Sequence, residues 1–180
     1  SGPRLENKHA AITGAGSGIG QAIAVRFAEE RAVVEILERD AEAAEATRAL
    51  IAEAGGVGHV VLVDVADEVS VKGVFEKLQS ERGPVDVLVN NAGAGWGAPF
   101  GQFPEQGWDK TMNVNAKSPF FLIQALAPLL KANASADNTT SISNIGSVAG
   151  MVGNAVDNFS YAVSNAAIHQ PTSVLSPELP

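Results

Sequence analysis

Short apolar segments alternate with amphipathic segments along most of the chain. Five apolar runs predict buried strands: residues 10–12, 32–37, 57–63, 85–89 and 140–145. Between them, apolar residues recur every three or four positions and predict helices: from residue 19, over 41–53, over 67–81, over most of 108–130 and from residue 160. Strands separated by helices need right-handed crossovers, so the pattern predicts an α/β fold with a parallel, doubly wound sheet in three layers, α/β/α. Because no repeat or linker interrupts this pattern, we expect residues 1–180 to form a single Rossmann-like domain.

Prolines are expected to disturb two of these helices. Ser118–Pro119 falls inside the segment 108–130 and is a candidate break. Pro171 and Pro177 fall in the last helix, where an interior proline removes a donor, clashes with the preceding turn and costs about 3 kcal/mol. We therefore expect the last helix to end or kink near His169.

Composition narrows the classes of function. With 180 residues, 46% of them hydrophobic, the chain is long enough for one globular domain with a core. A net charge of −8, a pI of about 4.8 and the absence of a basic run argue against nucleic acid or an anionic membrane as partners. No cysteine is present and the three histidines show no ligand spacing, so neither a disulfide nor a metal site is expected. No apolar run reaches about 18 residues and no signal peptide is visible, so we expect a cytoplasmic protein.

A glycine-rich turn joins the first predicted strand to the first predicted helix. Residues 13–20 are Thr-Gly-Ala-Gly-Ser-Gly-Ile-Gly. Glycine lets the backbone approach a pyrophosphate, and the free N–H groups of the helix start point at it. The fingerprint G-x-G-x-x-G is not matched, because Ile19 stands where the third glycine would be, and a P-loop fails for lack of a Gly-Lys-Ser/Thr sequence. The pattern T-G-x-x-x-G-x-G instead resembles the cofactor turn of the short-chain dehydrogenase/reductase family; a purely structural turn is the alternative.

The end of the second strand bears on the choice of cofactor. Glu38 follows Gly20 at close to the spacing at which an acidic side chain meets the adenosine ribose. A carboxylate there accepts hydrogen bonds from the ribose hydroxyls and repels a 2′-phosphate, which favours NAD over NADP. Two alternatives remain open: Glu38 is simply solvated in a charged turn, or Arg39 pairs with the phosphate of NADP.

Two further segments lie at predicted strand ends, where parallel sheets bind ligands. Asp64–Val65 closes the third strand and Asn90-Asn91-Ala92-Gly93 closes the fourth; the resemblance implies that the aspartate meets the adenine amino group and that the Asn-Asn-Ala-Gly turn lines the cofactor. The glycine-rich residues 93–97 are interpreted as a flexible active-site loop. The expected cofactor-binding residues are Gly14, Ser17, Gly18, Ile19, Gly20, Glu38, Arg39, Asp64, Val65, Asn91, Ala92, Gly93 and Tyr161.

The catalytic segments come later in the chain. Residues 113–120 resemble the family's helix with a structural and catalytic asparagine, here Asn115. Residues 145–150 resemble its serine segment, here with Ser147, and Tyr161 stands at the tyrosine of its Y-x-x-x-K motif. The resemblance implies that the serine holds the substrate oxygen and that the tyrosine exchanges the proton.

Asn165 occupies the position of the motif lysine. In the family, that lysine lowers the tyrosine pKa and holds the nicotinamide ribose; an asparagine can donate hydrogen bonds to a ribose but carries no charge. A free phenol, with a pKa of about 10, is ionised in roughly one molecule in a thousand at pH 7. Alcohol oxidation needs the phenolate and should suffer more than carbonyl reduction, so we predict residual activity biased toward reduction.

The resemblance covers nearly the whole chain but only about the front two thirds of a family domain. The family's C-terminal strands, its Pro-Gly turn and its substrate lid are not found, and Arg31 stands where the family commonly has a helix-capping glycine. Three functions remain open: an NAD(P)-dependent oxidoreductase acting on a small alcohol or ketone, a non-catalytic dinucleotide-binding protein, and an incomplete fragment. The resemblance also implies a homo-dimer or homo-tetramer, formed through the helix over 108–130 and the helix from residue 160.

Overall fold

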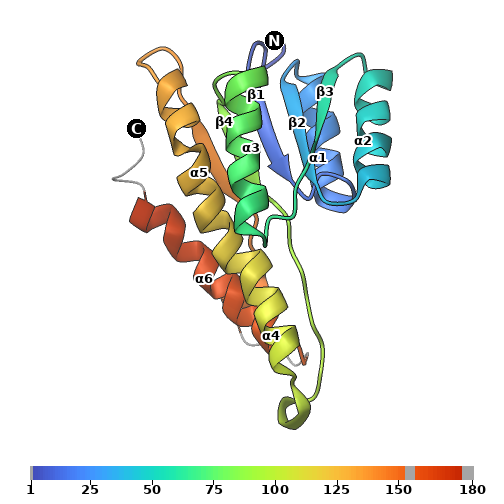
Figure 1. Ribbon diagram of the computed structural model, residues 1–180, viewed down its shortest axis with the longest axis vertical. Coiled ribbons are helices and arrows are strands. Elements are labelled where there is room, and N and C mark those ends of the chain that lie inside the picture. The colour runs from blue at the N-terminus through green and yellow to red at the C-terminus, as the bar shows by residue number, and fades with distance from the viewer. Residues whose placement is uncertain (1, 153–156, 176–180) are drawn as a thin grey trace.

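Five parallel strands form the centre of the molecule, and helices cover both faces of the sheet (Figure 1). The computed structural model describes the backbone of residues 2–152 and 157–175, and the side chains of these ranges as far as residue 170. The strands are β1 (His9–Thr13), β2 (Val33–Glu38), β3 (Val57–Leu62), β4 (Val87–Asn90) and β5 (Ser141–Asn144). Their order is β3-β2-β1-β4-β5, so the chain reverses direction across the sheet between β1 and β4. The predicted doubly wound α/β sheet is confirmed.

Two hydrophobic cores lie on opposite faces of this sheet. The helices are α1 (Gly18–Glu29), α2 (Ala41–Glu53), α3 (Glu68–Glu81), α4 (Glu105–Met112), α5 (Ser118–Asn133) and α6 (Phe159–Leu175). One core joins the sheet to α3 and α5 through Leu78 and Leu126, and the other joins it to α1 and α2 through Ala24 and Ile51. The sheet is thus sandwiched in three layers, as the sequence predicts.

Aspartate caps fix the starts of two helices. Asp40 accepts hydrogen bonds from the N–H groups of Glu42 and Ala43, and Asp67 accepts one from Ser70. Such side chains satisfy donors that a helix start leaves unpaired. The start of α1 is different, because the side chain of Ser17 makes no cap hydrogen bond. The N–H groups at that end are left available.

The segment from α4 to α5 is one long helical run, and the expected break at Ser118–Pro119 is wrong. Pro119 lies near the start of α5, where the hydroxyl of Ser118 donates to the Val114 carbonyl at 2.6 Å and helps to complete the hydrogen bonding of the preceding turn. The irregularity lies one turn earlier, where Asn113–Lys117 forms a π-helical turn. The helix also starts earlier than predicted, at Glu105, and the expected loop before it contains a short 3-10 helix, Phe100–Gln102.

The last helix does not end near His169, so the expected end there is wrong. The backbone of α6 remains helical through Pro171 to Leu175. The face of α6 before the proline is buried at Ser164 and Ile168, and this packing outweighs the loss of one backbone hydrogen bond. Pro177 lies outside the described residues.

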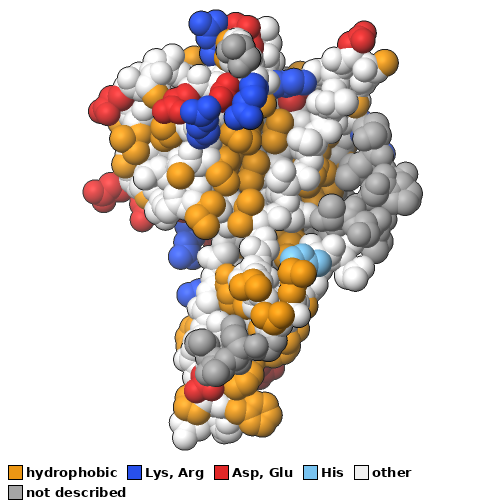
Figure 2. All heavy atoms as spheres, turned by 180° about the vertical axis from the view of Figure 1, so that it is seen from behind, with side chains coloured by type: hydrophobic (Ala, Val, Ile, Leu, Met, Phe, Trp, Pro, Cys, Tyr) orange, Lys and Arg blue, Asp and Glu red, His pale blue; other side chains and the backbone are white. Residues whose placement is uncertain are grey.

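The carboxyl ends of the strands all point toward one end of the molecule. The helix α4 and part of α6 project beyond these strand ends and form the lower part of the molecule (Figure 1). Seen from behind, this lower part carries exposed hydrophobic side chains, whereas many of the charged side chains gather at the opposite end (Figure 2). No helix in the described residues is long and apolar enough to span a membrane.

Candidate active site

A cleft of about 630 Å³ opens at the carboxyl ends of the strands. Its lining residues are Gly14, Ser17, Gly18, Ile19, Leu37, Glu38, Arg39, Val63, Asp64, Val65, Asn91, Ala92, Gly93, Ala94, Gly95, Lys110, Val114 and Tyr161. The cleft lies beside the point where the strand order reverses, which is where open parallel sheets bind ligands. Of the residues expected from sequence to bind a cofactor, all but Gly20 line it.

The glycine-rich turn has a geometry that larger residues would not reproduce. Gly14 and Gly18 have φ angles of +62° and +54°, in the left-handed region. A Cβ on Gly16 would lie 2.8 Å from the carboxylate of Glu38, and a Cβ on Gly20 would collide with the carbonyl of Gly14. Gly20 therefore lies behind the turn rather than in the cleft.

The beginning of α1 has unpaired donors, and two of the residues that carry them, Gly18 and Ile19, line the cleft. Within the described residues, the N–H groups of Gly18, Ile19 and Gly20 have no hydrogen-bond acceptor; the first N–H with one is that of Gln21, bonded to the Ser17 carbonyl. The first turn of α1 carries no acidic residue. This combination of free N–H groups and helix dipole fits a phosphate group.

Asn91 and Thr13 hold the glycine-rich turn against the end of β4. The Asn91 side chain donates to the carbonyls of Thr13 and Gly14, at 3.1 and 3.2 Å. The hydroxyl of Thr13 accepts from the N–H groups of Asn91 and Ala92, both at 2.9 Å. Two strand ends distant in sequence are thus fixed to each other at the floor of the cleft.

Glu38 and Arg39 form one end of the cleft wall. The Glu38 carboxylate accepts hydrogen bonds from the N–H groups of Gly16, Arg39 and Asp40, at 3.0, 2.9 and 3.2 Å. Backbone N–H groups from the glycine-rich turn and from the two residues after β2 therefore hold the carboxylate in place. Three accepted hydrogen bonds leave lone pairs for further donors, and the neighbouring Arg39 brings a cation to the same place.

Asn115 ties the loop after β4 to α6. Its side-chain oxygen accepts from the N–H of Ala94 and its amide donates to the Ala94 carbonyl, both at 2.8 Å. The same amide lies 3.0 Å from the hydroxyl of Ser164, which donates to the Tyr161 carbonyl at 2.9 Å. Asn115 is therefore buried in a hydrogen-bond chain that ends at the backbone of Tyr161, and it does not line the cleft.

Ser147 lies before a turn that packs on α6 and Asn165 lies within α6, but neither is among the lining residues. The Ser147 hydroxyl accepts from the N–H of Ala149 at 3.2 Å, at the start of a short 3-10 helix, Val148–Gly150. A Cβ on Gly150 would collide with the backbone of Asn165, so this turn lies directly against α6. The Asn165 side chain is buried, and its amide donates to the Tyr161 carbonyl at 2.9 Å.

Four lining residues were missed in the sequence: Leu37, Val63, Lys110 and Val114; Ala94 and Gly95 also line the cleft and belong to the expected active-site loop. Leu37 and Val63 directly precede the expected Glu38 and Asp64, so one residue more at each strand end would have found them. Lys110 and Val114 gave no signal, because they reach the cleft only through the course of their helical run. The described residues bring together no group of three potential metal ligands.

Comparison with known proteins decides the family. A family model described as short chain dehydrogenase matches residues 8–180. The chain belongs to the short chain dehydrogenase family. It is 39% identical over 175 residues to the rhamnolipids biosynthesis 3-oxoacyl-[acyl-carrier-protein] reductase of Pseudomonas aeruginosa, covering 97% of this chain and 68% of that one. It is 36% identical to the 3-oxoacyl-[acyl-carrier-protein] reductase FabG of Thermotoga maritima, covering 98% of this chain and 70% of the relative.

Solved structures of this short chain dehydrogenase family share the fold. The Pseudomonas aeruginosa RhlG/NADP active-site complex matches with a TM-score of 0.92 and 38% identity, over 97% of this chain and 68% of that one. NAD+-bound xylitol dehydrogenase matches with a TM-score of 0.89 and 29% identity, over 97% and 66%. The chain therefore spans about two thirds of the length of these relatives, and it has the nucleotide-binding, Rossmann-like fold of an oxidoreductase family.

Proposed function

We propose that the chain is an NAD(P)-dependent oxidoreductase that transfers hydride between a nicotinamide and a small alcohol or ketone. The supporting observation is that Gly18 and Ile19, whose N–H groups are free within the described part of the chain, line the same cleft as Tyr161. A dinucleotide held by that turn would share the cleft with the Tyr161 hydroxyl, which can exchange a proton. Family membership supports the same reaction class.

Each part of the cleft has a role in this proposal. The N–H groups at the start of α1 would bind the diphosphate, and Asp64 and Val65 would contact the adenine. The nicotinamide, when bound, supplies the carbon that gives or takes the hydride. In carbonyl reduction, Tyr161 gives its phenolic proton to the substrate oxygen as hydride reaches the carbonyl carbon, and then recovers a proton from water. The Ser147 hydroxyl, which accepts from Ala149, still has its own hydrogen to donate to that oxygen.

Glu38 favours NAD over NADP within this proposal. A ribose 2′-hydroxyl can donate to the backbone-held carboxylate, whereas a 2′-phosphate would meet its negative charge. Arg39 lines the same cleft and, by pairing with a 2′-phosphate, would favour NADP. The solved relatives include complexes with NADP and with NAD+, so the family alone does not choose.

A titration with NADH, followed by nicotinamide fluorescence and run in parallel with NADPH, tests the proposal. Saturable binding of NADH, weakened at least tenfold by Glu38→Ala, supports both the cleft and the role of Glu38. Equal binding of NADH and NADPH would contradict the proposed preference set by Glu38 and would indicate that Arg39 pairs with the 2′-phosphate of NADPH. No binding of either would overturn the proposed cofactor site.

A non-catalytic dinucleotide-binding protein is the second candidate, and Asn165 favours it. The Asn165 amide is bonded within its own helix and puts no positive charge beside Tyr161. The variant Asn165→Lys distinguishes the candidates when oxidation and reduction are both measured. A larger gain in oxidation than in reduction supports an impaired enzyme, whereas intact NADH binding without turnover in either protein supports the binding protein.

A further inference from the structure

Lys110 is the positive charge on the α4 side of the cleft. Four charged side chains line the cleft: Glu38, Arg39, Asp64 and Lys110. The first three follow β2 and β3, whereas Lys110 comes from α4, which follows β4. Because β1 lies between β2 and β4, Lys110 belongs to the other half of the sheet, across the glycine-rich turn from those three charges.

Packing against an aromatic ring, rather than a carboxylate, holds this cation. The Nζ of Lys110 lies 5.8 Å from the centre of the Trp96 ring, within the range of a cation–π contact. Trp96 is itself seated on Gly107, where a Cβ would lie 2.5 Å from the indole. Within the described part of the chain, no carboxylate oxygen lies within 4.0 Å of the Lys110 ammonium. The cleft therefore contains a positive charge that the protein does not neutralise.

The loop after β4 lies beside both Tyr161 and this cation. A Cβ on Gly95 would lie 4.0 Å from Cδ2 of Tyr161, and the residue after Gly95 is Trp96. Asn115 holds Ala94, on the other side of Gly95, through two hydrogen bonds of 2.8 Å. The loop is thus fixed with Tyr161 beside Gly95 and Lys110 over Trp96, and both side chains line the cleft.

An acidic substrate supplies the missing negative charge better than the cofactor does. The unpaired N–H groups suited to a diphosphate belong to Gly18–Gly20, in the other half of the sheet. An oxidised nicotinamide is itself positive and would gain nothing from a lysine. Resting on the proposed function, we propose that Lys110 binds the carboxylate of an oxo acid or hydroxy acid whose reacting carbon lies beside Tyr161.

Trp96 allows binding to be measured without turnover. The chain has two tryptophans, so a Trp108→Phe background leaves Trp96 as the single indole emitter. Acetoacetate is the anionic probe, and its ethyl ester is the neutral probe with the same ketone. Each is titrated with and without NADH against the Trp96 emission, in the background protein, in Lys110→Met and in Lys117→Met. Lys117 is a matched control, because its ammonium lies 5.9 Å from the Phe121 ring but does not line the cleft.

The expected result is selective for charge. Because Lys110 is exposed, Lys110→Met should weaken acetoacetate binding by up to about fivefold, as for one exposed ion pair, and should leave ester and NADH binding unchanged. Lys117→Met changes none of the three. Equal loss for acid and ester, no loss for either, or no saturable acetoacetate binding in the background protein would overturn the proposal.

The diphosphate of the cofactor is the other source of negative charge that Lys110 could bind. The titration with NADH distinguishes it from the carboxylate of a substrate. Weaker NADH binding in Lys110→Met with unchanged acetoacetate binding would assign Lys110 to the dinucleotide and overturn the proposal. Failure of the background protein to bind NADH would instead contradict the proposed function. The titration without NADH would still report on Lys110 in that case.

Discussion

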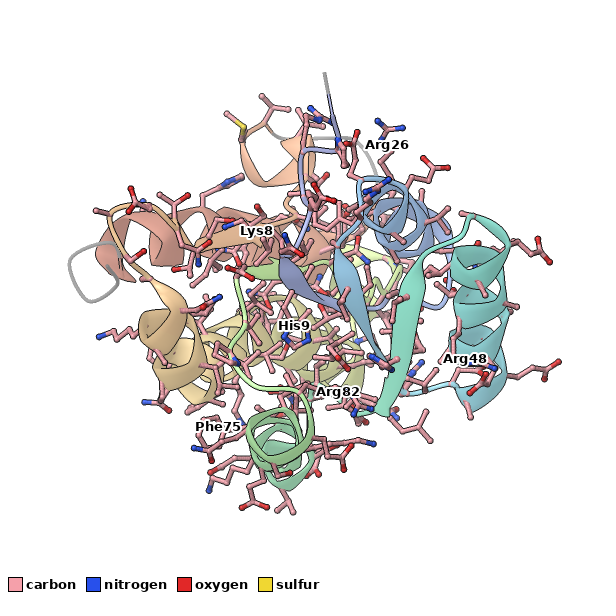
Figure 3. All side chains as sticks on the ribbon, turned by 90° about the horizontal axis from the view of Figure 1, so that it is seen from above. Lys8, His9, Arg26, Arg48, Phe75 and Arg82 are labelled. Carbon is pink, nitrogen blue, oxygen red and sulfur yellow. The ribbon has the colours of Figure 1, made fainter. Side chains whose placement is uncertain are left out.

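The imidazole Nε2 of His9 lies 2.9 Å from the carboxylate Oε1 of Glu35, at the end of the sheet opposite the cleft. The other ring nitrogen, Nδ1, lies 2.7 Å from the carbonyl of Pro84. A carbonyl only accepts, so Nδ1 donates to Pro84, and a protonated ring can donate from Nε2 to Glu35 as well. Arg82 adds a second cation 3.5 Å from the fully buried Glu35, and Figure 3 shows His9 and Arg82 near each other among the strand ends.

This pair predicts a pH-dependent stability. Burial opposes the charged ring, but the hydrogen bonds to Glu35 and Pro84 and the charges of Glu35 and Asp86 outweigh it, so the pKa of His9 is raised above 6.5. A raised folded pKa means stability that is complete below about pH 6.5 and is lost as the pH rises through the folded value. The free energy of unfolding in urea, measured from about pH 6 upward, should therefore fall across that window.

His9→Leu is the variant that isolates this contribution. It leaves Glu35 with Arg82 alone and should cost about 3 kcal/mol near pH 6, with a smaller cost at alkaline pH. The pH dependence of the variant should be flatter than that of the unsubstituted protein. An identical slope in both proteins would show that His9 is not the titrating group.

Arg31→Gly should stabilise the protein. Arg31 follows α1 with a φ of +68°, a conformation that costs a side-chain-bearing residue about 1–2 kcal/mol. Its exposed ion pair with Glu6, at 2.8 Å, contributes little. We expect a gain of about 1 kcal/mol in the free energy of unfolding. Arg31→Ala loses the same ion pair but keeps a Cβ, so it should give no gain; equal gains in both variants would contradict the backbone explanation.

Gly20→Ala should disrupt the cleft from behind. The new methyl group would collide with the Gly14 carbonyl and with the Asn91 amide that holds the turn. We expect the free energy of unfolding to fall by about 2 kcal/mol and the affinity for NADH to fall at least tenfold. Gly73→Ala, in α3, is the control because its Cβ meets nothing within 4 Å, and it should be stabilising by up to about 1 kcal/mol. Normal NADH affinity in Gly20→Ala would separate the turn from nucleotide binding.

Asn115 and Ser164 should be energetically coupled. They share the hydrogen bond of 3.0 Å that links the Ala94 loop to the Tyr161 backbone. In a double-mutant cycle of Asn115→Ala and Ser164→Ala, the cost of the double variant should be smaller than the sum by about 1 kcal/mol. Additive costs would mean that the loop and α6 are held independently. Of the two single variants, Asn115→Ala should cost more, since it also leaves both backbone groups of Ala94 without their partner.

Self-association through α5 is a further prediction. Phe120 on α5 and Trp108 on α4 are 40% and 39% exposed, large values for aromatic side chains on adjoining helices. Phe120→Asp should therefore shift a dimer or tetramer toward monomer in size-exclusion chromatography with light scattering. Val69→Asp, on the 77% exposed Val69 of α3, should leave the mass unchanged. A monomeric unsubstituted protein would contradict this prediction.

Local signals predicted much of the fold. The helix over 41–53 has the bounds expected from the sequence, because Asp40 caps its start and Gly55 follows its end with a φ of +77°. The strands were found within about two residues, since buried parallel strands are continuous apolar runs. The prolines misled, because Pro119 sits in a first turn and Pro171 in a helix held by its own buried face.

Contacts between distant residues could not be predicted in the same way. The three histidines carried no pattern, yet His9 meets Glu35 only because β1 and β2 are neighbours. The bond from Asn115 to Ser164 spans 49 residues and depends on how α6 crosses the helical run. Lys110 lies inside an amphipathic helix, where a lysine ordinarily signals a solvated face.

The π-helical turn at Asn113–Lys117 holds one residue more than an α-helical turn does. Removing one residue here would therefore leave a continuous α-helix, with α4 and α5 in nearly the same relative orientation. The extra residue matters locally instead, because Asn115 lies in this turn and its side chain holds Ala94 through two hydrogen bonds. A one-residue deletion in this turn should loosen the loop that contains Ala94 while leaving the packing of α5 on the sheet intact.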